Sequence, residues 1–523
     1  MIRICKPNIR SLNHLLLIIL FSWLILFYVN ERLLPKYAAK SCKWPKLEAS
    51  SDTQKEFKND QDQDKISEAR ATNVLFIADP QLIDNHTYPS RNQILLKLSE
   101  HTVDIHLKKN YNAFMSQLKP DYIFFLGDYL DNGRSSSRKY YKGQLKRFNR
   151  IFKKFKYKKN KNYFTNVAGN HDIGWADGVK IPSRKRFAKN FGKPNGIKLI
   201  NNVDFITLDT ISLSSSIEGI YRDARLFLDL NFGESIVKTN PRILLSHVPL
   251  FRDVEKYKCG PLRENPKFFT HGGYQYKLAL EPDISTEIIR KVKPDLIFTG
   301  DDHDYCDITH EEVEDQRVRE IAVKSISMAM GIRYPGVQIL TFVNENNEDY
   351  NLGNNFRYET KLCYTQTPYY NIISYVILAV ISSLMIWYWD IMQSANHGYT
   401  ILPYVNGATE PSFASASQKE KTSNLKKISK FIKDQDDESY KYNTGFSKYT
   451  SSAPRGSWLT NVINRIKLRT RFKFPIIDKF KLKSSPIVCI SLKKLNLGSF
   501  LKHSILMAIV VISVYYLGFC LTL

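Results

Sequence analysis

The sequence TGDDHDY (Thr299–Tyr305) concentrates three carboxylates and one histidine directly behind the apolar run DLIF. A short apolar run of this kind is typical of a buried strand, so the charged residues begin where a core ends. Moving a carboxylate out of water costs several kcal/mol unless a positive group compensates it. The cluster therefore indicates either a network of arginines or a metal site.

Other short apolar runs in the chain also end in polar residues of catalytic type. They read NVLFIADPQ, DYIFFLGDYLDNGR, YFTNVAGNHD, VDFITLDT and RILLSHVPL. Runs rich in Val, Ile, Leu and Phe are typical of strands buried on both faces, and residues 92–118 between the first two runs have helical spacing. We therefore predict an α/β fold whose chemistry gathers at one sheet edge, where the carboxyl ends of parallel strands meet. Asp104 and His106 on the helix are assigned to an exposed face.

Taken one at a time, the polar residues at these strand ends have ordinary structural explanations. An aspartate can cap a helix, an asparagine can occupy a turn, and a histidine after an apolar strand can be structural. The joint occurrence of GD..D.GR, GNHD, SH.P and GD.H, each directly after a strand, favours one common site instead. The candidate site residues are Asp79, Gln81, Asp128, Asp131, Arg134, Asn170, His171, Asp172, His247, Asp301, Asp302 and His303.

Over roughly residues 74–343, these motifs resemble those of the calcineurin-like metallophosphoesterases, whose blocks read D-x-H, G-D-x-x-D, G-N-H-[DE], a lone H and G-H-x-H. The resemblance implies a two-sheet sandwich flanked by helices, with two divalent metals bridged by one aspartate. By this resemblance Asp128 is the bridging carboxylate. Asp79 and His303 would belong to the first metal, and Asn170 and His247 to the second.

Two positions depart from the family pattern. Gln81 stands where the family has the histidine of D-x-H, and Asp301 stands where it has the first histidine of G-H-x-H. Amide and carboxylate oxygens are harder ligands than imidazole, so the departures favour Mn²⁺ or Mg²⁺, with Mn²⁺ expected. Whether Gln81 is itself a ligand stays open.

The family's mechanism gives the remaining candidates roles around the metals. The resemblance implies a metal-dependent phosphoric ester hydrolase in which a hydroxide bridging the two metals attacks phosphorus in line. His171 would contact the phosphoryl group and assist the leaving group, and Asp172 would orient it. Arg134 is expected to contact phosphate or to pair with Asp131, and Asp302 to lie near the substrate.

Three segments, ADPQLIDNHTYP, FLGDYLDNGR and GDDHDYC, narrow the resemblance to one branch of the family. They are similar to the fungal cell division control protein one branch, which is related to animal phosphodiesterases that remodel glycosylphosphatidylinositol (GPI) anchors. This implies removal of an ethanolamine-phosphate side branch from an anchor mannose, on GPI-anchored proteins or GPI lipid, with manganese. The alternatives are a lumenal phosphomonoesterase or protein phosphatase of the same fold, and a non-catalytic membrane cargo adaptor.

Three apolar stretches predict membrane spans at residues 14–29, 369–389 and 504–523. A cleavable signal peptide is the alternative for the first, but no small-x-small cleavage site follows it. The net charge of +25 is concentrated beside the spans without any nucleic-acid-binding motif, so we expect no nucleic-acid partner. The positive-inside rule places residues 1–13 and the basic, partly disordered segment 390–503 in the cytosol.

The rest of the chain is then expected on the lumenal side, in the endoplasmic reticulum membrane or the early Golgi. It divides into a stalk at residues 30–70, the metallophosphoesterase domain at residues 71–345 and a linker at residues 346–368. Cys42, Cys259, Cys306 and Cys363 fall in this region, and their pairing is left open. The sequon Asn85-His86-Thr87 lies there as well, so glycosylation is expected. The oligomeric state is not predicted.

Overall fold

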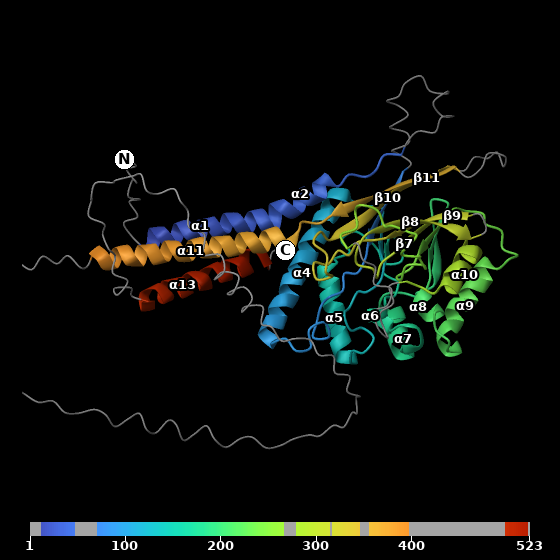
Figure 1. The fold of residues 1–523 in the computed structure, drawn as a ribbon, viewed down its shortest axis with the longest axis horizontal. Coiled ribbons are helices and arrows are strands. Elements are labelled where there is room, and N and C mark those ends of the chain that lie inside the picture. Colours follow the sequence, from blue (N-terminus) through green and yellow to red (C-terminus); the bar gives the residue numbers. More distant parts are fainter. Residues whose placement is uncertain are drawn as a thin grey trace, which may run out of the picture. The chain divides into compact units, whose positions relative to one another are not determined.

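The structure is a computed structural model that describes residues 12–47, 71–265, 279–313, 316–345, 355–396 and 497–520 (Figure 1). Its central feature is a pair of mixed β-sheets packed face to face, with helices on their outer faces. Every strand predicted from an apolar run is present, and the predicted α/β two-sheet sandwich is confirmed.

The first sheet has the strand order β11-β10-β1-β2-β3, in which β1, β2 and β3 run parallel and β10 and β11 antiparallel. Its strands are β1 Thr72–Ile77, β2 Tyr122–Phe125, β3 Tyr163–Phe164, β10 Gly336–Glu345 and β11 Asn355–Tyr364. The second sheet has the order β4-β5-β6-β7-β9-β8 with a parallel centre. Its strands are β4 Gly196–Ile200, β5 Val203–Thr207, β6 Arg242–Leu245, β7 Leu296–Thr299, β8 Cys306–Val313 and β9 Gln316–Ala322.

Phenylalanines from both sheets fill the space between them. The rings of Phe76 and Phe298 stack with their centroids 4.1 Å apart, and those of Phe124 and Phe205 lie 5.1 Å apart. Buried aromatic pairs of this kind add to the stabilisation from apolar burial, so they fix the two sheets against each other. The polar motifs that follow the strands of both sheets are thereby held together at one edge of the sandwich.

Helices cover the outer faces of the sheets, and the helix predicted over residues 92–118 is confirmed as α4. The helices of this domain are α4 Gln93–Leu118, α5 Arg138–Ile151, α6 Asn170–Ile173, η3 Ala176–Gly178, α7 Ile181–Asn190, α8 Thr210–Leu213, α9 Glu218–Phe232 and α10 Pro282–Val292. The expectation that Asp104 and His106 are exposed is wrong, because both are buried. The carboxylate of Asp104 accepts a 2.7 Å hydrogen bond from Arg147 on α5, so α4 is covered on this side as well.

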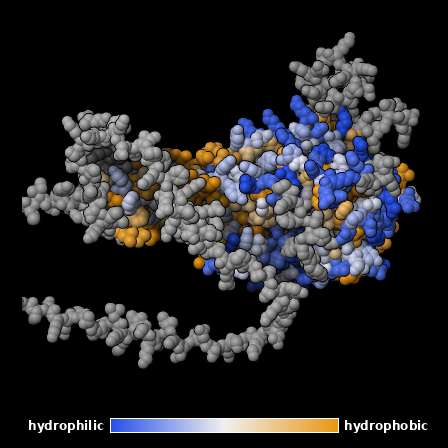
Figure 2. All heavy atoms as spheres, in the orientation of Figure 1, coloured by the Kyte–Doolittle hydropathy of each residue, from blue (hydrophilic) through white to orange (hydrophobic). Residues whose placement is uncertain are grey.

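Three helices are long and apolar enough to cross a membrane within the part of the chain that the structure describes. The first combines α1 Leu12–Tyr28, η1 Val29–Leu33 and α2 Leu34–Ser41, the second is α11 Pro368–Asn396, and the third combines α13 Leu497–Tyr515 and η5 Tyr516–Cys520. Figure 2 shows hydrophobic side chains gathered along this helical part, whereas polar side chains cover much of the sheet domain. The chain is therefore a membrane protein.

The structure differs from the predicted stalk and the predicted linker in two places. Residues 30–41 are helical instead of belonging to a stalk, because their polar side chains find partners: the Asn30 amide donates to Ser374 at 2.9 Å. Residues 355–364 form β11 instead of a linker, because their alternating side chains pair along the whole of β10. Residues 48–70 of the predicted stalk, and 346–354 of the predicted linker, lie outside the described residues.

The predicted cytosolic segment 390–503 also begins and ends inside helices. Asp390 lies in α11 and His503 lies in α13, and their side chains are 3.2 Å apart. Both helices therefore extend beyond their predicted apolar spans, and this polar pair joins them there. Residues 397–496 of this segment and residues 1–11 lie outside the described residues.

Two disulfides join the four cysteines whose pairing the sequence left open. Cys42, which follows α2, pairs with Cys363 of β11, and Cys259 pairs with Cys306 at the start of β8. The first disulfide ties the end of the first membrane helix to the edge of the first sheet. The second lies close to the predicted metal site.

Candidate metal centre

The metal-site residues follow β1, β2 and β7 in backbone conformations that most residues avoid. Asp79, Asp128, Asp301 and His303 all have positive φ angles, of 44°, 50°, 63° and 63°. A left-handed conformation costs a non-glycine residue about 1–2 kcal/mol. Four such residues gathered at one place indicate that the fold retains this strain because it aims the side chains at a common point.

The glycines of the motifs are required by close contacts at the same place. A Cβ atom at Gly127, whose φ is 97°, would collide with the ring of His247. One at Gly169 would collide with the carboxylate of Asp128. The Gly-Asp and Gly-Asn-His motifs therefore bring the backbone of one strand end against the side chain of another.

These turns gather two groups of metal-ligand atoms. The first consists of Asp79, Asp128 and His303, the second of Asp128, His247 and Asp301, and the ligand atoms within each group lie within 4.8 Å of one another. Asp128 belongs to both groups. The side-chain oxygen of Asn170 lies 3.2 Å from Nε2 of His247, beside the second group. The structure thus brings together the residues that the family resemblance assigned to each metal.

The donor atoms of this cluster fit divalent cations. The Oδ2 atoms of Asp79 and Asp301 and the Oε1 atom of Gln81 are buried, and within the described part of the chain they have no hydrogen-bond partner. A buried oxygen without a donor is costly unless a cation or another donor satisfies it. Bound cations would satisfy all three of these oxygens, which lie beside the two ligand groups.

The electrostatics of the cluster also call for positive charge. Burial raises the pKa of Asp79 well above its usual range. Burial would lower the pKa of His247, but the carboxylates of Asp128 and Asp301 hold it well above its ordinary value. Several buried carboxylates thus surround one imidazole, an arrangement in which bound cations would offset the negative charge.

His171 is oriented by the backbone of Asp131. Its main-chain N–H donates to Oδ1 of Asp128 at 3.0 Å, and its Nδ1 lies 2.6 Å from the carbonyl oxygen of Asp131. That contact makes Nδ1 the protonated donor to the carbonyl oxygen, so Nε2 is the nitrogen that faces the other groups of the site. The amide nitrogen of Gln81 lies 3.3 Å from the ring and donates to Asp131 Oδ1 at 3.0 Å. Gln81 can therefore steady His171 through its nitrogen and offer its unpartnered oxygen to a cation.

The structure gives Asp172 a different contact from the one expected. Its carboxylate accepts backbone N–H groups of Gly169 at 3.1 Å and of Tyr129 and Leu130 at 3.3 Å. Burial, reinforced by the charge of Asp128, raises the pKa of Asp172 to about 8. The group that orients the histidine is thus the Asp131 carbonyl, and Asp172 fastens the turn that carries Asp128.

Two residues beside the site were not identified from the sequence, namely His86 and Thr87. Oδ2 of Asp131 accepts from the Thr87 N–H at 2.7 Å and from its hydroxyl at 2.6 Å. Arg134 lies 3.1 Å from Nε2 of His86 and donates to the carbonyl oxygen of Asn170 at 3.2 Å. The His86 and His171 rings lie 6.2 Å apart. The signal is present in the sequence as Asn85-His86-Thr87, a sequon pattern that by itself predicts only glycosylation.

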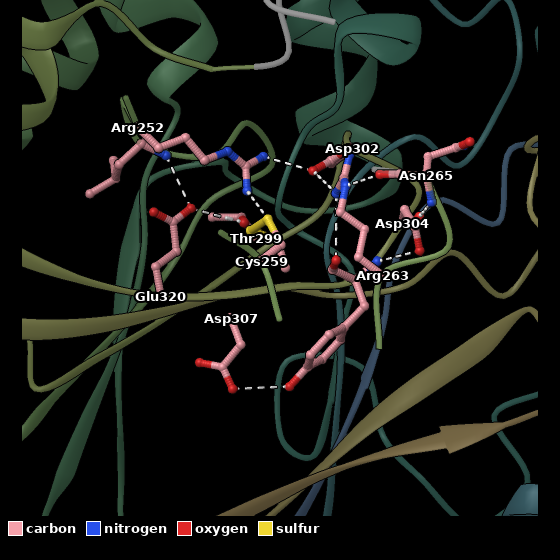
Figure 3. Close-up of a disulfide and its surroundings, with 12 residues drawn as sticks. Arg252, Cys259, Arg263, Asn265, Thr299, Asp302, Asp304, Asp307 and Glu320 are labelled. Carbon is pink, nitrogen blue, oxygen red and sulfur yellow. Dashed lines mark hydrogen bonds and ion pairs between the residues drawn. A yellow bond between two sulfur atoms is a disulfide. The ribbon is translucent and has the colours of Figure 1, made fainter. Parts of the chain in front are cut away.

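Asp302 does not belong to either ligand group, although its two neighbours do. It receives 2.8 Å and 2.7 Å contacts from the guanidinium groups of Arg252 and Arg263, and Figure 3 shows both arginines directed at it beside Cys259. Asp304 pairs with Lys324 at 2.9 Å. The carboxylate cluster that opened the sequence analysis therefore divides between a metal site and a network of basic side chains.

The comparisons with known proteins agree with this geometry. Residues 72–305 match the family model described as calcineurin-like phosphoesterase. The chain is 37% identical over 380 residues to Cell division control protein 1 of Saccharomyces cerevisiae, covering 71% of this chain and 73% of that protein. It is 25% identical over 335 residues to Metallophosphoesterase 1 of Xenopus laevis, covering 58% and 75%, and 26% identical over 309 residues to Metallophosphoesterase 1 of Ailuropoda melanoleuca, covering 55% and 70%.

Proposed function

This chain belongs to the calcineurin-like phosphoesterase family, and from that premise we propose that it removes an ethanolamine-phosphate side branch from a mannose of GPI anchors. The enzyme class is a metal-dependent phosphoric ester hydrolase. The proposal adds the substrate, which is a GPI-anchored protein or GPI lipid, and the place, which is the lumenal side of the endoplasmic reticulum or early Golgi membrane.

The observation that carries the chemistry is the position of Asp128 in both ligand groups. One carboxylate shared by two groups is the arrangement that holds a pair of metal ions close together. Two divalent cations bound there would polarise the phosphoryl oxygens and acidify a water molecule. The oxygen donors Gln81 and Asp301 suit Mn²⁺, which we propose as the resident metal.

The proton that the leaving group needs is assigned to His171. Because Nδ1 is held by the Asp131 carbonyl, Nε2 is the nitrogen from which a protonated His171 would give its proton to the leaving group. A mannose hydroxyl leaves as a strongly basic alkoxide, so the departing oxygen must take a proton as its bond to phosphorus breaks. Arg134, held between His86 and the Asn170 carbonyl, lies beside the ring and can neutralise phosphoryl charge.

A substrate held in a bilayer is supported by how the domain is fastened to the membrane helices. Nζ of Lys109 on α4 lies 2.9 Å from Oε2 of Glu31 in the first membrane helix, and both side chains are buried. The other carboxylate oxygen of Glu31 accepts from the Tyr375 hydroxyl of α11 at 2.6 Å. These contacts, together with the Cys42–Cys363 disulfide, hold the hydrolase domain against the spans instead of on a free tether.

The test is release of ethanolamine phosphate from a defined GPI glycolipid by the full chain in a bilayer with Mn²⁺. We expect release by the parent protein and loss of release in Asp128→Asn and His171→Ala. Cleavage of a generic phosphodiester without release from the anchor would remove the GPI substrate and keep the chemistry. A preference for phosphomonoesters would favour the phosphatase alternative, and inactivity on every ester with metal bound would favour the adaptor.

A further inference from the structure

One face of α4 carries a stripe of residues whose C-terminal half lies against the membrane helices and whose N-terminal half is exposed. Ile94, Leu98, His101, Ile105 and Lys109 follow the three- and four-residue spacing that places side chains on one side of a helix. Leu95 and Thr102 lie on the same side. The stripe therefore runs along α4 from its first turn to the Lys109–Glu31 ion pair.

The C-terminal half of this stripe packs against the ends of all three membrane helices. A cavity of about 410 Å³ is lined by Thr102, Ile105, His106 and Lys109 of α4 together with Glu31, Tyr375 and Tyr515 of the three spans. The rings of His101 and Tyr516 lie 5.9 Å apart. Glu31 follows α1, Tyr375 lies about two turns into α11 and Tyr516 directly follows α13, so α4 contacts the three spans toward the same end of their bundle.

The N-terminal half of the stripe continues beyond the spans without a cover among the described residues. The exposed fractions of Ile94, Leu95 and Leu98 are 80%, 56% and 60%, whereas Ile105 in the covered half is 8% exposed. At 1.5 Å per residue, Ile94 lies roughly 10 Å along the axis from His101, where the contact with the third span is made. Lipid that surrounds the spans at this level would meet these side chains.

We propose that α4 lies in the surface of the bilayer that the three helices cross, with Ile94, Leu95 and Leu98 among its lipids. The composition of this end of the helix suits that position, because Lys97 pairs with Glu100 at 2.8 Å yet leaves 75% of its side chain exposed toward the level of the head groups. The occupant is a lipid surface, and not a second protein, because the same stripe is already buried against membrane-spanning helices.

The position of α4 fixes where the metal site faces. Residues 79–92 lead directly from the Asp79 ligand, past His86, to the first turn of α4. A helix held in the bilayer surface at its N-terminal end would keep this segment, including His86 beside His171 and Arg134, next to the head groups. An ester group carried by a lipid-linked molecule could then be reached close to the membrane. The inference rests on the membrane helices and does not require the GPI substrate.

The experiment places a photo-reactive benzophenone amino acid at Leu98 in the full chain, in nanodiscs of phosphatidylcholine. The matched control carries the same group at Leu230 of α9, which is 73% exposed, and the reference carries it at Leu17 in the first membrane helix. Lipid adducts are counted by mass spectrometry of the labelled peptides. We expect adduct yields at Leu98 within about threefold of Leu17 and at least about tenfold above Leu230, because benzophenone reacts only with neighbours in contact.

Equal yields at Leu98 and Leu230, or adducts to a second copy of the chain, would overturn the proposal. A second measurement compares the double variant Ile94→Asn and Leu98→Asn with Leu226→Asn and Leu230→Asn, which has the same spacing on α9. We expect unchanged hydrolysis of a small soluble phosphodiester in both. Hydrolysis of a phosphodiester held in vesicles should fall at least about fivefold in the α4 variant only, a change of about 1 kcal/mol. An equal effect in both variants would also contradict the proposal.

Discussion

Replacing Asp302 by asparagine tests whether the carboxylate cluster is divided as the structure indicates. The side chain of Asp302 is 2% exposed, and those of its partners Arg252 and Arg263 are 3% and 7% exposed. Asp302→Asn keeps the size and one oxygen acceptor but removes the charge. Two buried guanidinium groups then lose a buried carboxylate with which both pair, while the metal ligands on either side are unchanged.

The expected loss follows from the burial of all three groups. Removing one partner of a buried ion pair costs about 3–5 kcal/mol, because the other charge is left without compensation. The remaining amide oxygen still accepts a hydrogen bond, so about 3 kcal/mol is expected for this variant. At about 2–4 °C per kcal/mol for a domain of this size, Tm should fall by roughly 6–12 °C.

The assay is thermal unfolding of the full chain followed by tryptophan fluorescence, with Mn²⁺ and with a chelator. The control is Asp223→Asn, because Asp223 pairs with Arg184 at 3.2 Å but is 73% exposed, and an exposed pair contributes about 0–1 kcal/mol. A Tm of Asp302→Asn no lower than that of Asp223→Asn would refute the argument. A loss that appears with Mn²⁺ and disappears with the chelator would refute it as well, because it would make Asp302 a metal ligand.

Other outcomes follow from the same geometry. His171→Ala should lower kcat about 10²–10⁴-fold with unchanged metal content, by steady-state kinetics and metal analysis; loss of metal would contradict its proton-transfer role. Asp301→Asn should retain about one of two metals per chain, because its carboxylate serves one ligand group; retention of both would exclude it as a ligand. Burial and a neighbouring carboxylate raise the pKa of Asp84 to about 6. Below about pH 4 this carboxyl is protonated in both the folded and the unfolded chain, and its full contribution to stability is present. As the pH rises from about 4 to 6, the unfolded chain loses this proton first, so the unfolding free energy should fall relative to that of Asp84→Asn. Parallel pH profiles of the two proteins would contradict this. Reducing or replacing the Cys259–Cys306 disulfide should cost about 2–5 kcal/mol in denaturant titrations; an unchanged midpoint would show that it adds no stability.

The sequence predicted the centre of the fold because the centre depends on local patterns. Several apolar runs that became strands end in a motif whose glycine or aspartate takes a left-handed turn, as at Gly127 and Asp128. A strand that is buried on both faces is apolar at nearly every position, so its sequence can be recognised without knowledge of its neighbours. The metal-ligand groups could be anticipated for the same reason, since every ligand lies within a few residues of a strand end.

The edges of the fold depend on partners that are distant in the sequence, and there prediction failed. Residues 355–364 alternate polar and apolar side chains and become a strand because β10 offers a free edge. Asp104 and His106 look like residues of an exposed helical face, yet Arg147 and the membrane helices bury them. A one-dimensional pattern shows which side of a helix is polar but not which neighbours will cover it.

The division of the carboxylate cluster shows the same limit at the scale of single residues. The Asp301 N–H donates to Oδ1 of Asp79 at 3.0 Å, and both Asp301 and His303 take left-handed backbone conformations. The intervening Asp302 is thereby directed away from the ligand groups and toward Arg252 and Arg263. Three consecutive residues thus serve two networks, because backbone contacts from another strand end set their directions. For the cluster as a whole, the sequence indicated either arginines or a metal. In the structure, Asp301 lies with the metal-ligand groups and Asp302 pairs with arginines.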